Sequence, residues 1–499
     1  MGKIELFEPG LAERLFTERE KPWRQKLRQE MSVQQRLKIP RHKMPEQPPQ
    51  QRIRNFLEVN LGYSLEMAKK EAQRCLDCGN PGCVAGCPVA IDIPTFIKYI
   101  EAGELEKALD KIRQTNGLPA ICGRVCPQEI QCEKNCNLVK AGREPVAIGH
   151  LERFVADYLS SPPLLSIRPE RVNSGREKIA VVGSGPAGLT VAADLARLGY
   201  QVTVFEALNI PGGVLAYGIP EFRLPRQILR SEINFIKSLG VEIKTNFIVG
   251  KTASLSDLRN LGYLAFFLGT GAGLPSFMNI PGENLLGVYS ANEYLTRVNL
   301  MKAFRFPDFD TPAPLGRKVA VIGGGNVAMD AVRTTLRLGA EEAVIYYRRS
   351  RAEMPARAEE IKHAEEEGVI FHFLTVPVRY SGGEKGRLKS MVLRRLALGE
   401  PDASGRPRPI PLPGSEFEVE VDLAVVAIGQ SPNPLLIKQL EGLKLGRWGK
   451  VEVDQKTMSS SLPGVYAGGD SVRGGATVIL AMGDGRRAAR AIDKFLRKC

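Results

Sequence analysis

Eight of the nine cysteines lie between Cys75 and Cys136, and the ninth is the last residue, Cys499. The first four follow the pattern C-x2-C-x4-C-x3-C-P, and the second four follow C-x3-C-x5-C-x3-C with a proline directly after Cys126. A compact run of four cysteines ending in Cys-Pro is typical of iron–sulfur proteins, in which the last cysteine of a run binds the other cluster. Zinc sites usually pair two short CxxC hooks, and a disulfide framework requires an oxidising compartment. The spacing therefore favours two 4Fe–4S clusters, with zinc as the alternative and Cys499 as an incidental thiol.

A nucleotide-binding motif, Gly183-x-Gly185-x-x-Gly188, directly follows the apolar stretch 179–182. Such glycines permit a tight turn and let the backbone approach a pyrophosphate at the N-terminus of the next helix, where the helix dipole favours an anion. Glu206 ends the next apolar stretch, where a carboxylate can accept from ribose hydroxyls. A GxGxxG alone is weak evidence, but strand, glycines, helix and acidic residue together predict a dinucleotide site.

A second motif of this kind starts at Gly323-x-Gly325, with Ala328 at the third glycine position, a replacement that the motif tolerates. Its second strand ends in Tyr-Tyr-Arg-Arg, where Arg348 and Arg349 replace the acidic residue of the first motif. An acidic side chain repels a 2′-phosphate, whereas guanidinium groups bind it bidentately. The first site is therefore expected to bind FAD and the second NADP(H), with a surface role for both arginines as the alternative. The expected NADP(H) contacts are Gly323, Gly325, Asn326, Val327, Arg348 and Arg349.

The C-terminal part of the chain is expected to complete the first site. One buried strand is expected from Val421 to a glycine turn, and another ends in a Gly-Gly-Asp turn at Asp470. Asp470 can accept a hydrogen bond from a flavin ribityl hydroxyl, and the helix that follows, running to about Leu496, can direct its positive end towards the flavin. A similar glycine turn at 268–272 precedes the second motif. The NADP unit is therefore predicted to be inserted into the FAD domain.

These elements predict an α/β protein with two Rossmann-like nucleotide-binding domains, preceded by an α-helical iron–sulfur domain. Apolar residues at helical spacing over 93–109 support a helical fold around the clusters. The length of 499 residues suits about three domains. The expected boundaries are 1–54 for a basic N-terminal arm, 55–170 for the helical domain with two 4Fe–4S clusters, 171–290 with 425–499 for the FAD-binding domain, and 291–424 for the NADP(H)-binding domain.

Charge and hydropathy indicate which broad classes of protein the chain does not belong to. The formal net charge is +14, and 43% of the residues are hydrophobic, which argues against extensive disorder. No run approaches the roughly 18 apolar residues of a membrane span, and no secretory signal is visible, so a cytoplasmic protein is expected. Basic residues gather between Arg24 and Arg54, which predicts an extended arm that wraps a partner subunit, with a solvated linker as the alternative. Anionic cofactors account for much of the remaining charge, and without a nucleic-acid-binding motif no nucleic-acid partner is expected.

In these motifs the sequence resembles the small (β) subunit of NADPH-dependent glutamate synthase and its relatives, over about 54–496. The relatives include the large subunit of NADH-dependent ferredoxin:NADP oxidoreductase, sulfide dehydrogenase, homotetrameric glutamate synthase and the N-terminal part of dihydropyrimidine dehydrogenase. The shared motifs are the cysteine runs, GSGPAG, PGGVLAYGIPEFRLP, GGGNVAMD, YYRR and YAGGD. The motifs and the resemblance together place FAD contacts at Gly183, Gly185, Pro186, Ala187, Gly188, Glu206, Gly213, Gly271, Gly469, Asp470, Ala476 and Thr477.

The resemblance also implies which residues bind the clusters. One cluster would take Cys75, Cys78, Cys83 and Cys136, and the other Cys87, Cys126 and Cys132. In the relatives the fourth ligand of the second cluster is an oxygen-bearing side chain from a downstream helix, at the position of Glu152. Cys122 would then bind neither cluster. The alternative makes Cys122 the ligand and Glu152 a surface carboxylate.

We expect an enzyme that moves electrons between NADP(H), FAD and the clusters. Hydride transfer depends on stacking and distance, so no catalytic acid or base is predicted. Three functions remain, of which the first is the electron-input subunit of glutamate synthase, beside a large FMN subunit. The second is the large subunit of an electron-bifurcating NADH-dependent ferredoxin:NADP oxidoreductase or a sulfide dehydrogenase, beside ferredoxin and a smaller FAD/NAD subunit. The third is a non-catalytic scaffold with structural clusters. The first two require a second redox subunit as partner.

Overall fold

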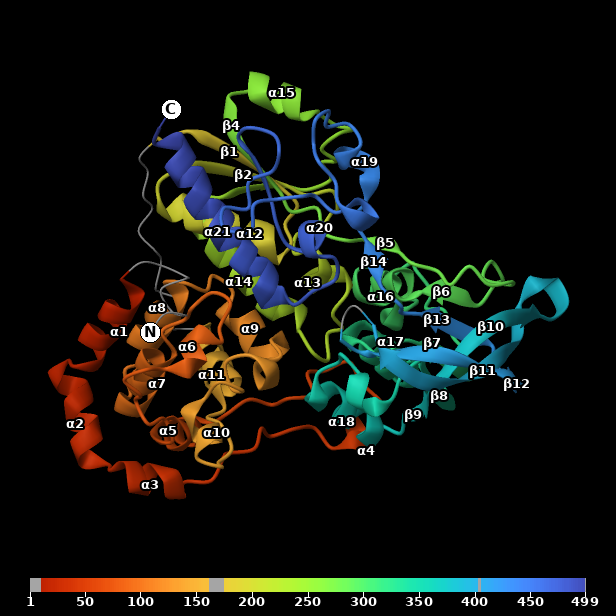
Figure 1. Cartoon of the computed structure of the whole chain (residues 1–499), viewed down its shortest axis with the longest axis horizontal. Helices are drawn as coiled ribbons and strands as arrows, with labels where there is room; N and C mark the ends of the chain where they lie inside the picture. Colours follow the sequence, from red (N-terminus) through yellow and green to blue (C-terminus); the bar gives the residue numbers. More distant parts are fainter. Residues whose placement is uncertain (1–9, 161–174, 403–404, 499) are drawn as a thin grey trace.

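The computed structural model describes residues 10–160, 175–402 and 405–498, which form three parts that lie against one another (Figure 1). A helical part comes first in the chain, and two α/β units follow, each built on a five-stranded sheet. The predicted fold class is therefore confirmed. Within these described ranges, no helix is long and apolar enough to cross a membrane.

The helical part surrounds the cysteine-rich segment. Its elements are α5 (Leu65–Gln73), α6 (Gly82–Ala85), α7 (Ile93–Ala102), α8 (Leu105–Arg113), α9 (Pro119–Val125), the short 3₁₀ helix η1 (Gln128–Ile130), α10 (Asn137–Lys140) and α11 (Ile148–Ser160). The helical spacing over 93–109 belongs to two helices, because Gly103 ends α7 with a φ of 82° before α8 begins. Glycine adopts this left-handed conformation without the steric cost that a Cβ would add.

Residues 10–60 form a strap that runs from the helical part to the second α/β unit, drawn in red down the left edge and then along the lower edge of Figure 1. Its helices are α1 (Leu11–Arg19), α2 (Pro22–Glu30), α3 (Val33–Lys38) and α4 (Pro49–Arg52). Three buried strap arginines form ion pairs with the rest of the chain: Arg24 with Asp77, Arg36 with Glu101 at 2.8 Å, and Arg52 with Glu367 at 2.8 Å. The alternative of a solvated linker is therefore wrong for these three arginines, because buried guanidinium groups require partners and find them within the chain. Contact of this segment with a partner subunit stays a prediction.

The first α/β unit has the parallel strand order β15-β4-β1-β2-β3. Its strands are β1 (Lys178–Val182), β2 (Gln201–Phe205), β3 (Glu242–Lys244), β4 (Tyr263–Leu268) and β15 (Val465–Ala467). Its helices are α12 (Pro186–Arg197), α13 (Val214–Tyr217), α14 (Arg226–Ser238), α15 (Leu255–Asn260), α19 (Pro434–Ile437), the 3₁₀ helix η5 (Arg447–Gly449), α20 (Asp470–Arg473) and α21 (Val478–Leu496). The chain leaves β1 towards β2 and returns on the other side at β4, so the carboxyl ends of β1 and β4 form the switch point where such sheets bind ligands.

The second α/β unit has the parallel strand order β6-β13-β7-β8-β9. Its strands are β6 (Val288–Ser290), β7 (Lys318–Ile322), β8 (Glu342–Tyr347), β9 (Ile370–Phe373) and β13 (Leu423–Val426), and its helices are α16 (Ala291–Asn299), the 3₁₀ helices η2 (Ala303–Arg305) and η3 (Arg351–Glu353), α17 (Asn326–Arg337) and α18 (Ala358–Glu366). The sequence had assigned the strand after Val421 to the first site, with a boundary between 424 and 425. The structure instead pairs β13 with β6 and β7, so that boundary falls inside a strand of the second sheet.

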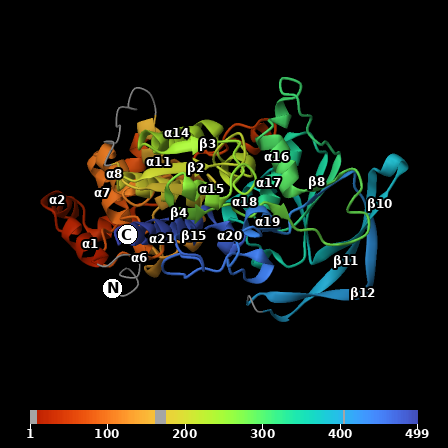
Figure 2. The ribbon, with the colours of Figure 1, turned by 90° about the horizontal axis from the view of Figure 1, so that it is seen from above.

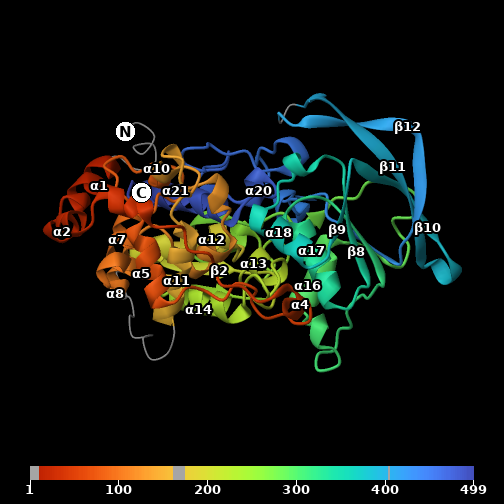
Figure 3. The ribbon, with the colours of Figure 1, turned by 90° about the horizontal axis from the view of Figure 1, so that it is seen from below.

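A third, antiparallel sheet projects from the second unit, as Figures 2 and 3 show. It consists of β10 (Thr375–Gly382), β11 (Leu388–Pro401) and β12 (Pro407–Glu420), with the 3₁₀ helix η4 (Glu384–Gly386) between the first two. The chain passes between the two α/β units at β5 (Leu274–Pro275) and β14 (Gln430–Ser431), which pair with each other. The second unit is thus inserted into the first through a two-stranded connection, as the matching glycine turns had indicated.

The helical part and the first α/β unit share one hydrophobic core, to which α9 contributes Ile121, α12 contributes Ala193 and α21 contributes Met482. The second unit packs around a separate core that includes Val321 and Ile345. The cysteine-rich segment is therefore fixed relative to the first glycine motif, whereas ion pairs and the strap hold the second unit in place.

Replacing Arg52 by alanine should loosen the strap. Arg52 Nε donates to Glu367 Oε1 at 2.8 Å and Arg52 Nη2 to Glu366 Oε2 at 2.8 Å, and removing one partner of a buried ion pair costs roughly 3 kcal/mol. Hydrogen exchange should therefore become faster in peptides covering 45–60, as measured by mass spectrometry. Arg54→Ala removes an exposed arginine two positions away and is the matched control. Equal protection in both variants would contradict the assigned role of Arg52.

Candidate functional site

Four cysteines from the two runs line one pocket in the helical part. They are Cys75 after α5, Cys78 in the next loop, Cys83 in α6 and Cys136 before α10, the set expected at one cluster. All four thiols are free, and burial raises the pKa of Cys75 to about 12. Four sulfur donors around one pocket fit a 4Fe–4S cluster, whose binding requires the thiols to lose their protons.

Two glycines let the loops that carry these cysteines pack closely. A Cβ at Gly82 would lie 2.4 Å from the carbonyl oxygen of Asn135, and a Cβ at Gly86 would lie 2.7 Å from that of Gln131. Such distances are well inside van der Waals contact, so a larger residue would separate the first cysteine run from the second. The absence of a side chain at both positions therefore helps to form the pocket.

The three cysteines expected at the second cluster, Cys87, Cys126 and Cys132, are buried near one another. Burial raises the pKa of Cys87 to about 12 and that of Cys132 well above its ordinary value. The charges of Cys126 and Glu152 add to both shifts, which shows that these groups are neighbours. The donor set fits a second iron–sulfur cluster that lies deeper than the first.

Both candidates for its fourth ligand are present at this site. Glu152 on α11 is only 5% exposed, burial raises its pKa to about 8, and Asn116 Nδ2 donates to its Oε1 at 2.6 Å. Cys122 lies one turn before Cys126, with its Sγ 3.4 Å from Met482 Sδ. The alternative that made Glu152 a surface carboxylate is wrong, because the side chain is buried. A buried carboxylate held by a neutral amide is costly, and a metal centre would offset that cost.

The residues expected to bind FAD gather at one edge of the first sheet. Gly183, Gly185, Pro186, Ala187 and Gly188 follow β1, Glu206 follows β2, Gly213 lies beside the glycine turn, Gly271 follows β4, Gly469 and Asp470 follow β15, and Ala476 and Thr477 precede α21. Carboxyl ends of parallel strands meet at the same edge, which explains how residues so far apart in the sequence come together. Their binding of FAD stays a prediction.

The glycine turn leaves room for a pyrophosphate. A Cβ at Gly183 would lie 2.4 Å from Gly269 O and one at Gly188 would lie 2.0 Å from Gly183 O, whereas a Cβ at Gly185 would meet no atom within 4 Å. Gly185 is the N-cap of α12, so open space lies where the helix dipole favours an anion. The turn therefore fits the diphosphate of a dinucleotide.

Glu206 and Asp470 are the acidic residues of this edge. Glu206 is buried, with Ser184 N donating to its Oε2 at 2.9 Å and Leu208 N to its Oε1 at 2.8 Å. A carboxylate has about four lone-pair sites, so Glu206 keeps acceptor capacity for a ribose hydroxyl. Burial raises the pKa of Asp470 to about 6, and the N–H of Ala476 donates to its Oδ1 at 3.2 Å. Both residues fit the predicted roles.

At the second motif, Gly323 has a φ of 146°, and a Cβ there would lie 2.4 Å from Ala427 O. Gly325 is the N-cap of α17, and Asn326 Oδ1 accepts from the N–H of Arg357 at 2.9 Å. Val327, in the first turn of α17, is 40% exposed. The open N-terminus of α17 therefore fits a second pyrophosphate.

The two arginines after β8 lie in different environments. Arg348 is exposed, but Arg349 is only 2% exposed. Arg349 Nη2 donates to Asp402 Oδ2 at 2.6 Å and Arg349 Nε donates to Pro407 O at 2.8 Å. The sequence treated the pair as equivalent because it gave no sign of Asp402, which lies on a distant β-hairpin.

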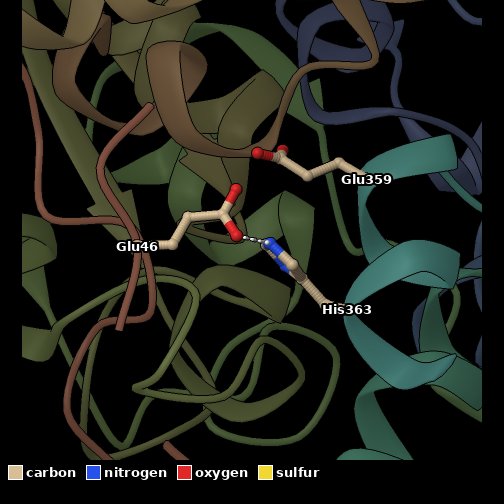
Figure 4. A group of neighbouring side chains, drawn as sticks. All are labelled: Glu46, Glu359 and His363. Atoms are coloured by element: carbon tan, nitrogen blue, oxygen red, sulfur yellow. Dashed lines mark ion pairs between the residues drawn. The ribbon is translucent and has the colours of Figure 1, made fainter. Parts of the chain in front are cut away.

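A further group of side chains, Glu46, Glu359 and His363, lies between the strap and α18 (Figure 4). His363 Nε2 lies 3.2 Å from Glu46 Oε2, and the pKa of Glu46 is lowered to about 2, chiefly by its interaction with His363. Lys362 Nζ lies 3.6 Å from Glu46 Oε1, and Arg357 Nη2 donates to Glu359 Oε2 at 2.9 Å. Because cations already neutralise both carboxylates, we interpret this group as a contact that holds the strap on α18 rather than as a metal site.

Two family models match the chain. Residues 52–162 match dihydropyrimidine dehydrogenase domain II, 4Fe–4S cluster, and residues 177–485 match the pyridine nucleotide-disulphide oxidoreductases. A solved structure, FprA of Mycobacterium tuberculosis in complex with NADPH, is 22% identical, covers 64% of this chain and 85% of its own length, and has a TM-score of 0.54, which supports the fold of the α/β units. The fold and the site thus define an NADPH-dependent oxidoreductase with FAD, NADP(H) and 4Fe–4S clusters as cofactors.

Curated relatives show to which family of oxidoreductases the chain belongs. The NADP(+)-dependent formate dehydrogenase subunit beta of Moorella thermoacetica is 44% identical over 83% of this chain, which spans 60% of that relative's length. The glutamate synthase [NADPH] small chains of Azospirillum brasilense and Escherichia coli are each 36% identical, over 91% and 93% of this chain and 95% and 99% of their own lengths. The chain therefore belongs to the family of iron–sulfur flavoprotein oxidoreductases that includes the small chain of NADPH-dependent glutamate synthase.

Gly185→Ala should weaken FAD binding without unfolding the protein. The added methyl group meets no protein atom but enters the space expected for the pyrophosphate, so FAD content should fall about tenfold or more, as measured by absorbance after gel filtration. Gly273→Ala, another glycine whose added Cβ would meet nothing within 4 Å, is the control and should keep its flavin. Full FAD retention by Gly185→Ala with an unchanged melting temperature would place the pyrophosphate elsewhere.

Proposed function

We propose that this chain is the electron-input subunit of a larger enzyme, taking reducing equivalents from NADPH and delivering them to a second redox subunit. In the leading assignment that partner is the large subunit of glutamate synthase. The observation that carries the proposal is the course of α21. This helix begins at the expected flavin site, and within its first two turns it contacts Cys122 and lies close to Pro88, the residue that follows Cys87.

Thr477 caps α21 by accepting from the N–H of Leu480 at 3.3 Å, beside Asp470 at the end of β15. Five residues after the cap, Met482 contacts Cys122, and a Cβ at the next residue, Gly483, would lie 3.0 Å from Pro88 O, the carbonyl oxygen of the residue that follows Cys87. When bound, FAD accepts a hydride and the clusters carry single electrons. The chain holds the two sites at a fixed separation within one core, a condition that electron transfer requires.

The first group of cysteines lies nearer to the protein surface. Three of its four cysteines, Cys78, Cys83 and Cys136, are only partly buried, and Cys75 is buried. All three cysteines of the second group, Cys87, Cys126 and Cys132, are buried. This difference in burial supports an electron-transfer path from the nucleotide sites to the more buried cysteines and then to the less buried ones, where a partner can dock. A scaffold with structural clusters would not need the flavin site and the two groups of cysteines to follow one another in this spatial order.

Two partners are supported by the comparisons. The alignment covers nearly the whole length of the glutamate synthase small chains, which favours a glutamate synthase large subunit. The 44% identity to the formate dehydrogenase subunit favours a formate-oxidising subunit as the second candidate. A ferredoxin-linked partner, which the resemblance also implied, is the third.

Anaerobic titration of the purified chain with NADPH should bleach both flavin and cluster absorbance. The reduced chain is then mixed with a glutamate synthase large subunit, glutamine and 2-oxoglutarate. In a separate arm, the oxidised chain is mixed with a formate-oxidising subunit, formate and NADP⁺. Glutamate formation with the first partner would support the leading assignment, and formate-dependent NADPH formation the second. Without any bleaching the chain would be a scaffold, and the proposal would fail.

Cys87→Ala should separate hydride transfer from electron delivery. Flavin reduction by NADPH should remain within about twofold, because hydride transfer needs only the nucleotide sites, whereas reduction of a one-electron acceptor should fall at least tenfold. Stopped-flow absorbance measures the first rate and steady-state assays the second. Cys499→Ala, which removes a thiol outside both cysteine runs, should change neither.

Iron content tests the fourth ligand of the second cluster. Glu152→Ala should reduce iron to about half of the wild-type value through loss of that cluster, whereas Cys122→Ala should keep it, because we assign the carboxylate as ligand. Melting temperatures of both variants show whether the fold is retained. The opposite pattern, with iron lost only from Cys122→Ala, would make the thiol the ligand.

A further inference from the structure

Asn116 lies in the loop between α8 and α9, where it contacts both candidates for the fourth ligand of the second cluster. The side chain is fully buried, and its Oδ1 accepts from the N–H of Leu118 at 2.8 Å, a contact that asparagine forms in turns. Because only the oxygen of the amide can accept from an N–H, this contact fixes which end of the amide is Nδ2. Nδ2 points to Glu152 on α11 and donates to its Oε1 at 2.6 Å.

The amide of Asn116 therefore sets the orientation of the Glu152 carboxylate. The hydrogen bond occupies Oε1, so Oε2 is the oxygen that can bind iron. Carboxylates that bind metals are commonly held by a hydrogen bond of this kind, and the partner that donates it orients the ligand. The loop before α9 thus fixes a side chain that α11 carries.

Asn116 also contacts the competing ligand. Cys122 is fully buried, and its Sγ lies 3.7 Å from Asn116 Oδ1 and 3.4 Å from Met482 Sδ. A thiol that donates to either acceptor must give up that contact to bind iron, because ligation requires the thiolate. One amide thus orients the carboxylate through its nitrogen and contacts the thiol through its oxygen.

The loop has main-chain contacts that do not depend on the side chain of Asn116. The N–H of Asn116 donates to Ile112 O at 2.9 Å, and the N–H of Ala120 donates to Oε1 of the buried Glu232 on α14 at 2.9 Å. A substitution at position 116 keeps both contacts. Such a substitution therefore tests the ligand more directly than it tests the fold.

We propose that Asn116 is a positioning residue that selects Glu152 rather than Cys122 as the fourth ligand of the second cluster. The amide nitrogen orients the carboxylate, and the amide oxygen engages the thiol. This inference rests on the assignment of Glu152 as ligand, which belongs to the proposed function. Ligand identity is one of the features that set the potential of an iron–sulfur cluster, so the selection bears on electron delivery to the first group of cysteines.

Iron content of purified variants tests the selection. Asn116→Leu keeps the branched shape of the side chain but has no hydrogen-bonding group, so Cys122 should replace Glu152 and the iron content should stay near the wild-type value. Combining Asn116→Leu with Cys122→Ala should remove about half of the iron, although each single variant keeps it. Asn299→Leu, the same change at another buried asparagine outside the helical part, is the control and should keep its iron with or without Cys122→Ala.

Mössbauer spectra of protein enriched in ⁵⁷Fe give a readout that a merely structural role would not move. Iron with an oxygen ligand gives a different doublet from iron bound by sulfur alone, so the wild-type chain should show it for about one iron in eight and Asn116→Leu should not. Asn116→Ser keeps a hydroxyl that can accept from the N–H of Leu118 but lacks the Nδ2 donor, so it should match Asn116→Leu even if the leucine variant folds poorly.

Three results would overturn the inference. The first is an oxygen-bound doublet that persists in both Asn116 variants, with only the melting temperature lowered. The second is full iron content in the double variant. The third is loss of iron from both single variants at position 116, because Cys122 would then be no competing ligand.

These measurements also separate the inference from the proposed function, because they use neither NADPH nor a partner subunit. If the wild-type chain shows only sulfur-bound iron and Glu152→Ala keeps all of its iron, the ligand assignment itself fails. If NADPH bleaches neither flavin nor clusters, the proposed electron-input function fails whichever ligand is present. If oxygen-bound iron is found in the wild-type chain and in both variants at position 116, only the role of Asn116 fails.

Discussion

The close packing of α21 between α12 and the cysteine-rich segment is the constraint on which the arrangement depends. A Cβ at Gly485 would lie 2.6 Å from Ala187 O, and a Cβ at Gly483 would lie 3.0 Å from Pro88 O. Two glycines two positions apart therefore let one helix approach the glycine-motif helix and the Cys87 loop together. Larger residues would push the flavin site and the cysteines apart, and electron transfer weakens steeply with separation.

The second α/β unit is held by a different kind of interaction. Arg223 from the first unit pairs with Asp330 at 2.7 Å and with Glu360 at 2.8 Å, both in the second unit. Arg333 extends this network to Glu367, which also binds Arg52 of the strap. Buried ion pairs add little net stability, because desolvation offsets much of their attraction, but they tolerate few alternative arrangements. The network thus sets where the second nucleotide site lies relative to the first.

Local motifs were predictable because their geometry depends on neighbours in the chain. The glycine turns at Gly183 and Gly323 were located from a handful of residues, since a strand, a tight turn and a helix N-terminus follow one another directly. The helix after Thr477 was also located to within a few residues. The strand at β13 was assigned to the wrong unit, because a short apolar strand pairs equally well with either parallel sheet until the chain's course is known.

By itself, the sequence determined the kinds of chemistry: cysteine runs for iron–sulfur clusters and two glycine motifs for dinucleotides. The tertiary structure decided which side chains share each site. Arg349 meets Asp402 from 53 positions away, and Arg52 meets Glu367 from 315 positions away, so no local pattern records either pair. The resemblance had already pointed to Glu152 as a ligand, but only folding buries this side chain in the neighbourhood of Cys87. Burial and long-range pairing arise from packing of the whole chain, and residue type and spacing cannot encode them locally.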